Sequence, residues 1–261
     1  MIAVSVIMVL VVAALAYFLI NQGIREAPRI ALSNAKNLLL GEKFTGTYYV
    51  TVTTQMNSRT TTSSYTSTIS ISPSINASVM NGTELTEFNG AVVHVNTTVA
   101  TWVHGNEFCQ VLVSISNASP YNRTTTFCVP SNYSKYLLPF YVDEELFGNA
   151  MYVGEGSWND KTTYCFASNV TIIEPSITTT AGKTAGKTTI GPPVTTIINA
   201  TRICILSNGV ITSKTLYETI QLPSHQSFVT IINETLTNYS LTFNQQLLNQ
   251  LMQLMNKTEQ G

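Results

Sequence analysis

The longest apolar run in the chain lies at its start. Residues 1–20 are apolar with two exceptions, and the first charged side chain is Arg25. A helix of about 20 residues, rising about 1.5 Å per residue, spans roughly 30 Å, which is the thickness of a bilayer's hydrocarbon core. The pattern therefore predicts a transmembrane anchor over residues 1–23. Ala14-Leu15-Ala16 has the small-residue pattern of a cleavage site, so a removable signal peptide is the alternative.

Two further segments repeat apolar residues at helical spacing. Residues 24–41 carry one apolar face at steps of three and four, and Gly41 ends it. Residues 243–261 carry a similar stripe and predict a C-terminal amphipathic helix and tail. This second helix is too short and too polar to cross a membrane. We expect it to pack on a sheet or beside the first helix, and the alternatives are a membrane surface or a subunit contact.

Between these helices the hydrophobic period changes to two. Apolar and polar side chains alternate in many short runs from Thr47 onward, with long examples at 65–71 and 93–103. Strict alternation predicts half-buried antiparallel strands that are wet on one face. Asn159-Asp160 and Asn208-Gly209 are typical of tight hairpin turns. The expected fold class is therefore α+β, mostly antiparallel β, with a transmembrane helix first and a helix at each end of the sheet.

Two stretches interrupt the alternation. Residues 130–147 contain Pro139 and an acidic group, Asp143-Glu144-Glu145, which suits a short helical turn. Residues 174–196 are rich in Thr, Gly and Pro without periodicity, so we expect an exposed mobile loop there. We treat residues 24–242 as one exoplasmic β-rich domain that contains this loop.

Composition indicates export. Charged residues make up 10% of the chain and the net charge is −1, so nothing draws it toward nucleic acid. Half of the 22 asparagines begin the acceptor motif Asn-x-Ser/Thr, which favours a glycosylated surface protein. The acceptors are Asn76, Asn81, Asn96, Asn117, Asn122, Asn132, Asn169, Asn199, Asn233, Asn238 and Asn256. Alternatively, the motif is frequent only because Thr is common in strands and Asn is common in the neighbouring turns.

The charges that follow the apolar run bear on which side of the membrane the rest of the chain lies. Arg25, Arg29, Lys36 and Lys43 follow the apolar run, and the positive-inside rule would keep them cytoplasmic. Paired cysteines, glycosylation acceptors and low charge all favour the opposite side. We therefore expect a single-pass protein of the cell membrane whose bulk is extracytoplasmic.

Four cysteines form an even set. Each lies in a strand-like run. Cys109 and Cys128 are placed symmetrically about the turn at 117–122, and Cys165 and Cys204 are placed symmetrically about the Thr/Gly loop. Folding each hairpin brings its two cysteines within disulfide reach, which selects 109–128 and 165–204 among the three possible pairings. A zinc site is the rival interpretation, but no Cys-x-x-Cys occurs and the histidines are scattered.

Other motifs carry no chemistry of their own. The tandem Gly-Lys-Thr of 182–188 has three residues between its glycines where a phosphate-binding loop needs four. His94 and His104 are ten residues apart without an acid or nucleophile beside them, and Asp143-Glu144-Glu145 suits a solvated helix start. We predict no catalytic residue, no cofactor and no metal site, and we expect the protein not to be an enzyme.

The layout resembles exported half-barrel modules of the LolA/LppX lipoprotein-carrier type. The resemblance rests on an opening helix, a long meander, a helical break and disulfide-tied hairpins around Tyr164-Cys165-Phe166 and Ile203-Cys204-Ile205. It implies a curved sheet wrapped around a helix, with a concave apolar face able to hold a lipid or apolar ligand. It supplies no catalytic residues.

The sequence thus supports two functional hypotheses. The first is a membrane-anchored extracytoplasmic binding module that uses residues 1–20 as its tether and takes a lipid or apolar ligand, or a surface protein, as its partner. The second is a pilin-like or surface-layer-associated structural subunit, although Ser5 stands where pilins carry glutamate.

Overall fold

The computed structural model describes residues 26–56, 59–88, 91–116, 123–130, 141–180, 187–222 and 227–259. The predicted anchor over residues 1–23 lies outside these ranges. Among the described residues, no helix combines the length and the apolar character that a bilayer crossing requires.

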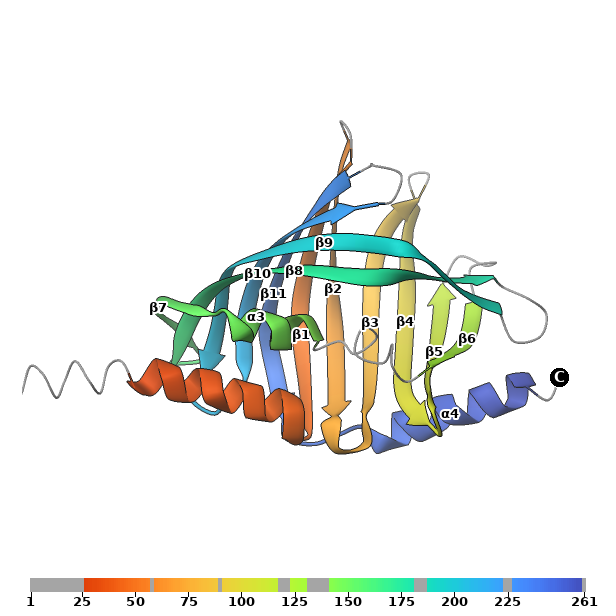
Figure 1. The fold of residues 1–261 in the computed structure, drawn as a ribbon, viewed down its shortest axis with the longest axis horizontal. Helices are drawn as coiled ribbons and strands as arrows, with labels where there is room; N and C mark the ends of the chain where they lie inside the picture. The colour runs from red at the N-terminus through yellow and green to blue at the C-terminus, as the bar shows by residue number, and fades with distance from the viewer. Residues whose placement is uncertain are drawn as a thin grey trace, which may run out of the picture.

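One open antiparallel sheet of 11 strands dominates the chain (Figure 1). The order of the strands across it is β6-β5-β4-β3-β2-β1-β11-β10-β9-β8-β7. The strands are β1 (Phe44–Met56), β2 (Arg59–Ser72), β3 (Ala77–Phe88), β4 (Ala91–His104), β5 (Glu107–Ser116), β6 (Arg123–Pro130), β7 (Met151–Trp158), β8 (Lys161–Thr180), β9 (Lys187–Leu206), β10 (Ile211–Gln221) and β11 (Ser227–Ser240).

The sheet consists of two meanders that meet at its middle. Strands β1 to β6 pair in chain order, and so do β7 to β11, while the contact between β1 and β11 joins the two sets. Every pairing is antiparallel, as the period-two pattern predicts. The helices are 26–41, α3 (Tyr141–Gly148) between the meanders and α4 (Gln245–Glu259) after the second, with a short 3-10 turn η1 (Pro73–Ile75) before β3.

Turn chemistry follows the sequence closely at two hairpins. Asn159 and Asp160 both have positive φ between β7 and β8, which is the conformation of a type I′ turn. Gly209 has a φ of 91° between β9 and β10. A Cβ at Gly209 would lie 2.4 Å from the carbonyl carbon of Asn34, so a glycine there lets this hairpin abut helix 26–41. Asn34 also donates from Nδ2 to the Ser207 carbonyl at 2.7 Å.

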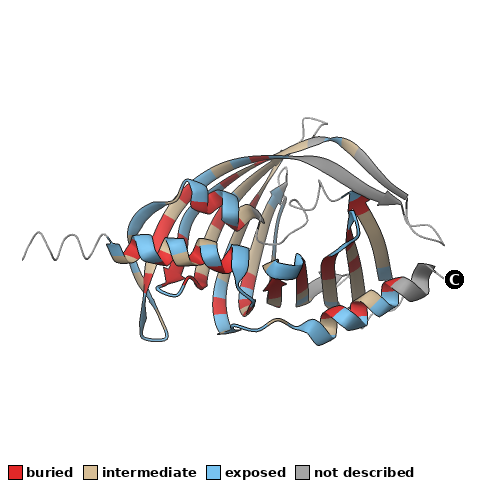
Figure 2. Cartoon of the chain, turned by 60° about the horizontal axis from the view of Figure 1, so that its bottom comes forward, coloured by how far each residue is buried: buried red, intermediate tan, exposed pale blue. Residues whose placement is uncertain are grey.

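We call the face of the sheet that carries Phe44, Tyr48 and Val50 the inner face. Figure 1 shows that the sheet curves around this side, and helix 26–41 and α3 lie against it. The buried residues there form one cluster with both helices. Helix 26–41 contributes Ala31, Ala35, Leu38 and Leu39, and α3 contributes Leu146 and Phe147. The predicted apolar face of the first helix is therefore confirmed, and Figure 2 shows its buried stripe turned toward the sheet.

The opposite, outer face carries a second and smaller core. Helix α4 packs there on β3, β4 and β5 through Leu248, Leu251 and Met255. Its partners include Val79, Ala100 and Trp102, which alternate with the inner-face residues of the same strands. Of the four interpretations of the C-terminal helix, packing on the sheet is the one observed. The two cores thus lie on opposite faces and on different halves of the sheet.

The prediction of a mobile loop over residues 174–196 is wrong for most of its length, because the structure has strands there. Residues 174–180 belong to β8 and 187–196 belong to β9, and the two pair as one long hairpin that reaches β6 (Figure 1). Pro175 stands opposite Pro193 next to a register shift, which is where a ladder accepts proline. Thr, Ile and Val favour extended backbone, so the low-complexity composition suits strands as well as it suits a loop. The Gly-Lys repeat of 182–188 lies mostly outside the described residues.

Candidate functional site

A cavity of about 90 Å³ lies between the inner face and its two covering helices. Helix 26–41 supplies Leu38 and Leu39, and strands β1, β2 and β10 supply most of the remaining apolar wall. Its lining comprises Leu38, Leu39, Phe44, Tyr48, Ile69, Ile71, Asp143, Gly209, Ile211, Lys214 and Glu234. Since one water occupies about 30 Å³ in the liquid, the cavity has room for a small group or the end of a longer molecule.

Three charged side chains meet in the polar wall of this cavity. Lys214 Nζ donates to Asp143 Oδ1 at 3.1 Å and to Oδ2 at 3.3 Å, and it lies 3.0 Å from Glu234 Oε2. Lys214 and Glu234 are direct partners in the ladder between β10 and β11, whereas Asp143 comes from α3. The three side chains are 11%, 17% and 9% exposed in the order Lys214, Glu234, Asp143. The ion pair between Asp143 and Lys214 therefore links α3 to the inner face of the sheet.

Burial sets the protonation behaviour of this group. Removal from water raises the pKa of Asp143 above its ordinary value, although the ammonium of Lys214 opposes the shift. The pKa of Lys214 is raised as well, because the carboxylates of Asp143 and Glu234 outweigh its own desolvation. Burial also raises the pKa of the Tyr48 hydroxyl, which donates to the Ile211 carbonyl at 3.3 Å. Two carboxylates and one ammonium leave the fully ionised group with one excess negative charge.

The raised pKa of Asp143 predicts a pH dependence of stability. A carboxyl whose pKa is higher in the folded than in the unfolded chain holds its proton more tightly when folded, so its contribution is full at low pH and falls as pH rises from about 3.8 through the raised value. We expect wild type to lose stability relative to Asp143→Asn over that interval. Urea unfolding of both proteins between about pH 3.5 and 7 measures the difference, and a slope of opposite sign would contradict the assignment.

A second, more open depression of about 200 Å³ continues the inner face beside the cavity. Tyr65 and Ser67 of β2 line it, and they precede Ile69 and Ile71 in the same alternating pattern. Met80 of this depression is the ladder partner of Ile69. Its lining comprises Tyr65, Ser67, Met80, Gly82, Glu84 and Thr97. The cavity and the depression therefore lie next to each other along β2, and we call the two together the trough, with the cavity as its covered end and the depression as its open end.

Two larger depressions lie elsewhere and are less suited to an apolar ligand. One of about 310 Å³ lies on the outer face beside α4, with mostly Thr, Ser and Asn in its wall. The other, of about 440 Å³, lies by the β7–β8 and β9–β10 turns and includes Lys161, Ser207 and Asn208. We therefore take the trough on the inner face as the candidate site.

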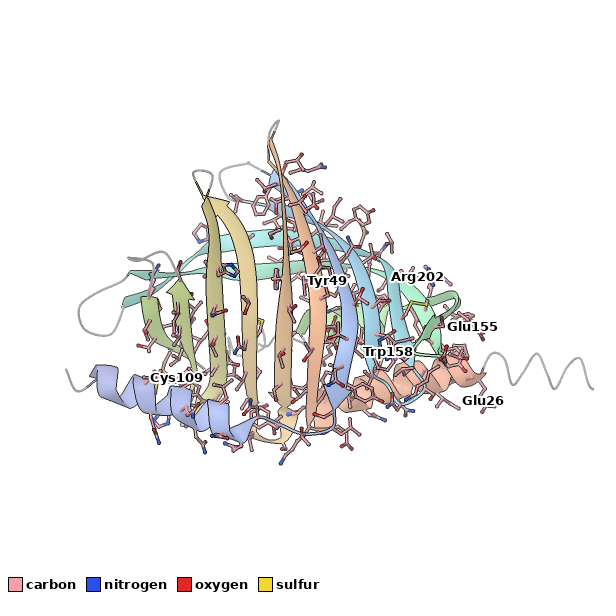
Figure 3. All side chains as sticks on the ribbon, turned by 180° about the vertical axis from the view of Figure 1, so that it is seen from behind. Glu26, Tyr49, Cys109, Glu155, Trp158 and Arg202 are labelled. Atoms are coloured by element: carbon pink, nitrogen blue, oxygen red, sulfur yellow. A yellow bond between two sulfur atoms is a disulfide. The ribbon has the colours of Figure 1, made fainter. Side chains whose placement is uncertain are left out.

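Both expected disulfides are present. Cys109–Cys128 joins β5 to β6 and Cys165–Cys204 joins β8 to β9, each between direct ladder partners. Arg202 donates from Nε to the Cys204 sulfur at 3.2 Å, and Figure 3 shows Arg202 on the same part of the sheet as Trp158 and Glu155. Both bridges lie away from the trough, because their cysteines alternate with inner-face residues such as Phe166.

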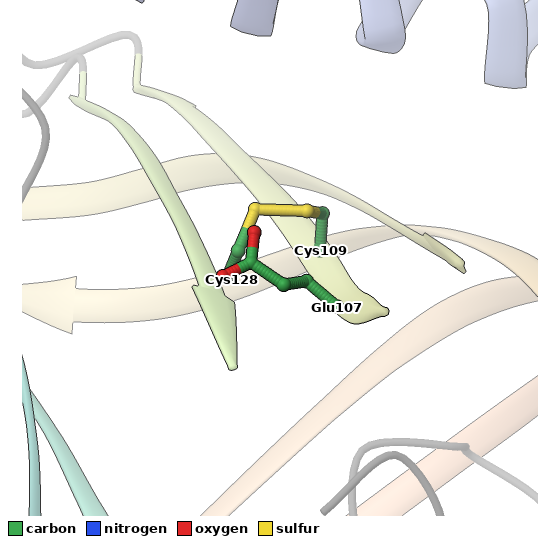
Figure 4. A group of neighbouring side chains, drawn as sticks. All are labelled: Glu107, Cys109 and Cys128. Carbon is green, nitrogen blue, oxygen red and sulfur yellow. A yellow bond between two sulfur atoms is a disulfide. The ribbon is translucent and has the colours of Figure 1, made fainter. Parts of the chain in front are cut away.

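Glu107 lies beside the first disulfide, and its carboxylate approaches both sulfur atoms (Figure 4). Three such groups, whose possible ligand atoms lie within 4.8 Å of one another, resemble a metal site in outline. The sulfur atoms are bonded to each other, however, and a thiolate rather than a disulfide is the ligand that metals bind. Within the described residues the histidines belong to no cluster of three metal-ligating side chains.

The predicted glycosylation acceptors fall into two sets. Asn117, Asn122 and Asn132 lie outside the described residues, and so does the side chain of Asn256. The other seven are exposed: Asn76, Asn81, Asn96, Asn169, Asn199, Asn233 and Asn238. They remain predictions as glycosylation sites, and all seven positions are accessible to a modifying enzyme.

Sequence patterns alone did not locate the trough. Of its charged residues the sequence singled out Asp143, but as part of a solvated helix start, whereas the structure buries it against Lys214. Lys214 and Glu234 sit on alternating strands whose inward positions are mostly apolar. What sets Lys214 and Glu234 apart from their neighbours is that they are charged residues at inward positions of a strand. This can be recognised only once it is known which face of β10 and β11 points inward.

No protein-family model matches the chain. No curated protein matches it either. Among solved structures, a DUF1329 family protein from Desulfovibrio piger is 8% identical, and the match covers 84% of this chain and 92% of that chain with a TM-score of 0.28. A beta-barrel-like protein of the DUF1849 domain family from Brucella abortus is 8% identical, with 78% and 99% covered and a TM-score of 0.30.

A domain named for outer membrane lipoprotein sorting, from Vibrio parahaemolyticus, is 9% identical, with 86% of this chain and 98% of that chain covered and a TM-score of 0.26. The chain therefore has a distant structural similarity to a lipoprotein-sorting domain and to DUF1329 and DUF1849 proteins, in agreement with the resemblance seen in its layout.

Proposed function

We propose that the protein is an extracytoplasmic binding module that holds an apolar ligand in the trough of its inner face. The observation that carries this proposal is the trough itself. An enclosed apolar cavity with a few converging polar groups is the usual form of a small-molecule site. Here the covered end has seven aliphatic or aromatic side chains around one ion group, and the open end continues along β2.

Geometry limits the mode of binding. The covered end is too small for a whole lipid, so a ligand would place its apolar end under Leu38 and Leu39 and extend past Ser67 toward Gly82. Burial of each methylene group from water stabilises the complex by about 0.8 kcal/mol. Two disulfides are typical of an oxidising compartment, which supports a location outside the cytoplasm. Anchoring through residues 1–20 remains part of the proposal.

Gly82 offers a way to close the trough without disturbing the backbone. A Cβ there would have its nearest neighbours at 3.6 Å or more, at ordinary van der Waals distance. Gly82→Phe would place a ring in the open depression, and we expect it to weaken binding of the neutral apolar probe N-phenyl-1-naphthylamine about tenfold or more, which is about 1.4 kcal/mol. Fluorescence titration of the delipidated protein measures the change.

Thr66→Phe is the matched control, because Thr66 is exposed on the outer face of the neighbouring strand. It adds the same ring to the same sheet without entering the trough, so probe affinity should be unchanged. Circular dichroism would establish that both variants fold. Equal probe affinity in Gly82→Phe and wild type, or no probe binding by folded wild type, would count against an apolar ligand in the trough.

A further inference from the structure

Asparagines occur within the strands in one sequence context. Asparagine is depleted in β-strands because its side chain competes for backbone hydrogen bonds. The described strands nevertheless contain six, and each begins an Asn-x-Ser/Thr motif: Asn81, Asn96, Asn169, Asn199, Asn233 and Asn238. The asparagines that lack the motif lie in helices, turns and connections, or outside the described residues. Co-occurrence of turn-rich Asn with strand-rich Thr does not explain acceptors placed in strands.

All six strand asparagines lie on the outer face. Asn238 and Asn81 belong to the row of ladder partners that passes through Thr47, next to the inward Tyr48. Asn96 pairs with Thr83, and Asn199 pairs with Asn169. Asn233 pairs with Thr51, which alternates with the inward Val50. Because side chains alternate with a period of two, the hydroxyl residue lies on the same face as its asparagine in five of the six motifs. In the sixth, Thr201 lies at a register shift of β9 two residues after Asn199.

The local contacts suit attachment of a sugar. The Thr83 hydroxyl donates to Asn96 Oδ1 at 2.6 Å, and the Thr215 hydroxyl donates to Asn233 Oδ1 at 3.0 Å. In both, the hydrogen bond engages the amide oxygen, while an N-linked glycan attaches through the amide nitrogen. Two exposed apolar side chains stand directly opposite acceptors: Ile115, 53% exposed, faces Asn96, and Tyr217, 41% exposed, faces Asn199.

We propose that these six asparagines carry N-linked oligosaccharides that form one coat over the outer face and leave the inner face bare. The acceptors fall on β3 and β4, on β11, and on β8 and β9, so neighbouring groups are two or three strands apart, or about 10–15 Å. A sugar on Asn96 or Asn199 would cover Ile115 or Tyr217. A glycan coat also supplies the hydration that a surface with 10% charged residues otherwise lacks.

Glycopeptide mass spectrometry of the full-length protein, purified from the cells that naturally produce it, tests the proposal. We expect oligosaccharide on most of the six peptides and none on Asn106 or Asn208, which are exposed in turns but lack the motif. Unmodified asparagine at most of the six positions would overturn the coat. This readout is independent of any ligand, so it stands or falls separately from binding in the trough.

Matched variants at one motif sharpen the result. Thr171 is exposed on the outer face two residues after Asn169. Thr171→Ala should remove the sugar of Asn169, and Thr171→Ser should retain it with the same melting temperature. Enzymatic removal of all glycans should leave N-phenyl-1-naphthylamine affinity unchanged within about twofold, because the sugars and the trough lie on opposite faces. A large loss of probe affinity on removal would place sugars against the inner face and contradict the one-sided arrangement.

Discussion

Replacing Lys214 with methionine is expected to destabilise the protein by about 3–5 kcal/mol at pH 7, because it leaves two buried carboxylates without their shared cation. Asp143 and Glu234 both lie within 3.1 Å of the Lys214 ammonium and are largely shielded from water. Methionine preserves the length and apolar stem of lysine, so the loss reports the charge rather than a packing defect. Urea unfolding followed by circular dichroism measures it.

Three companion measurements decide whether the effect comes from the ion group. Lys161→Met removes an exposed lysine at the β7–β8 turn and should change stability by no more than about 0.5 kcal/mol. The cost of Lys214→Met should shrink as the pH falls toward about 4, because burial raises the pKa of Asp143 and its carboxyl can take up a proton. Adding Asp143→Asn and Glu234→Gln should recover much of the loss. Stability of Lys214→Met equal to that of Lys161→Met would show that the buried charges are not coupled.

Local patterns were sufficient for the elements that local physics determines. Alternation marked strands such as β4, helical spacing marked 26–41 and α4, and Asn-Asp and Asn-Gly marked two hairpins. The disulfides were predictable because hairpin symmetry alone brings Cys109 to Cys128 and Cys165 to Cys204. In each case the interacting residues are close in sequence or related by a single turn.

Features that depend on distant pairing were not predictable. The contact of β1 with β11 joins residues almost 200 positions apart, such as Thr45 and Ser240, and no local signal specifies it. This contact brings Tyr48 and Glu234 to the same face. Asp143 reaches Lys214 across 71 positions, so a residue that looks solvated in its own helix is buried by a strand of the second meander. The trough is a product of these long-range contacts.

The two faces of the sheet differ in the side chains that they carry. The inner face buries apolar side chains, the ion group and the trough, whereas the outer face presents hydroxyl and amide side chains across most strands. Because successive side chains of a strand point to opposite faces, one strand can supply apolar residues to the inner face and polar residues to the outer face. Helix α4 and both disulfides lie on the outer side, so a ligand can occupy the trough without contact with either.

Removal of Cys165–Cys204 is expected to cost more stability than removal of Cys109–Cys128. The first bridge closes a sequence separation of 39 residues and the second one of 19. Restriction of the unfolded chain grows with the length of the closed loop, which gives about 4 kcal/mol for the longer loop and about 3 kcal/mol for the shorter one. Paired Cys→Ala variants avoid free thiols, and urea unfolding under non-reducing conditions provides both values.

The longer bridge also supports the inner face indirectly. Cys165 and Cys204 precede and follow Phe166 and Ile203, which are ladder partners in the inner core. We therefore expect the Cys165→Ala/Cys204→Ala pair to weaken binding of N-phenyl-1-naphthylamine as well, while Cys109→Ala/Cys128→Ala leaves it unchanged, since that bridge lies under α4. A larger loss of stability on removing Cys109–Cys128 would show that loop length does not govern the contribution of these bridges. Weaker probe binding in the Cys109→Ala/Cys128→Ala variant alone would show that proximity to the inner core does not govern it either.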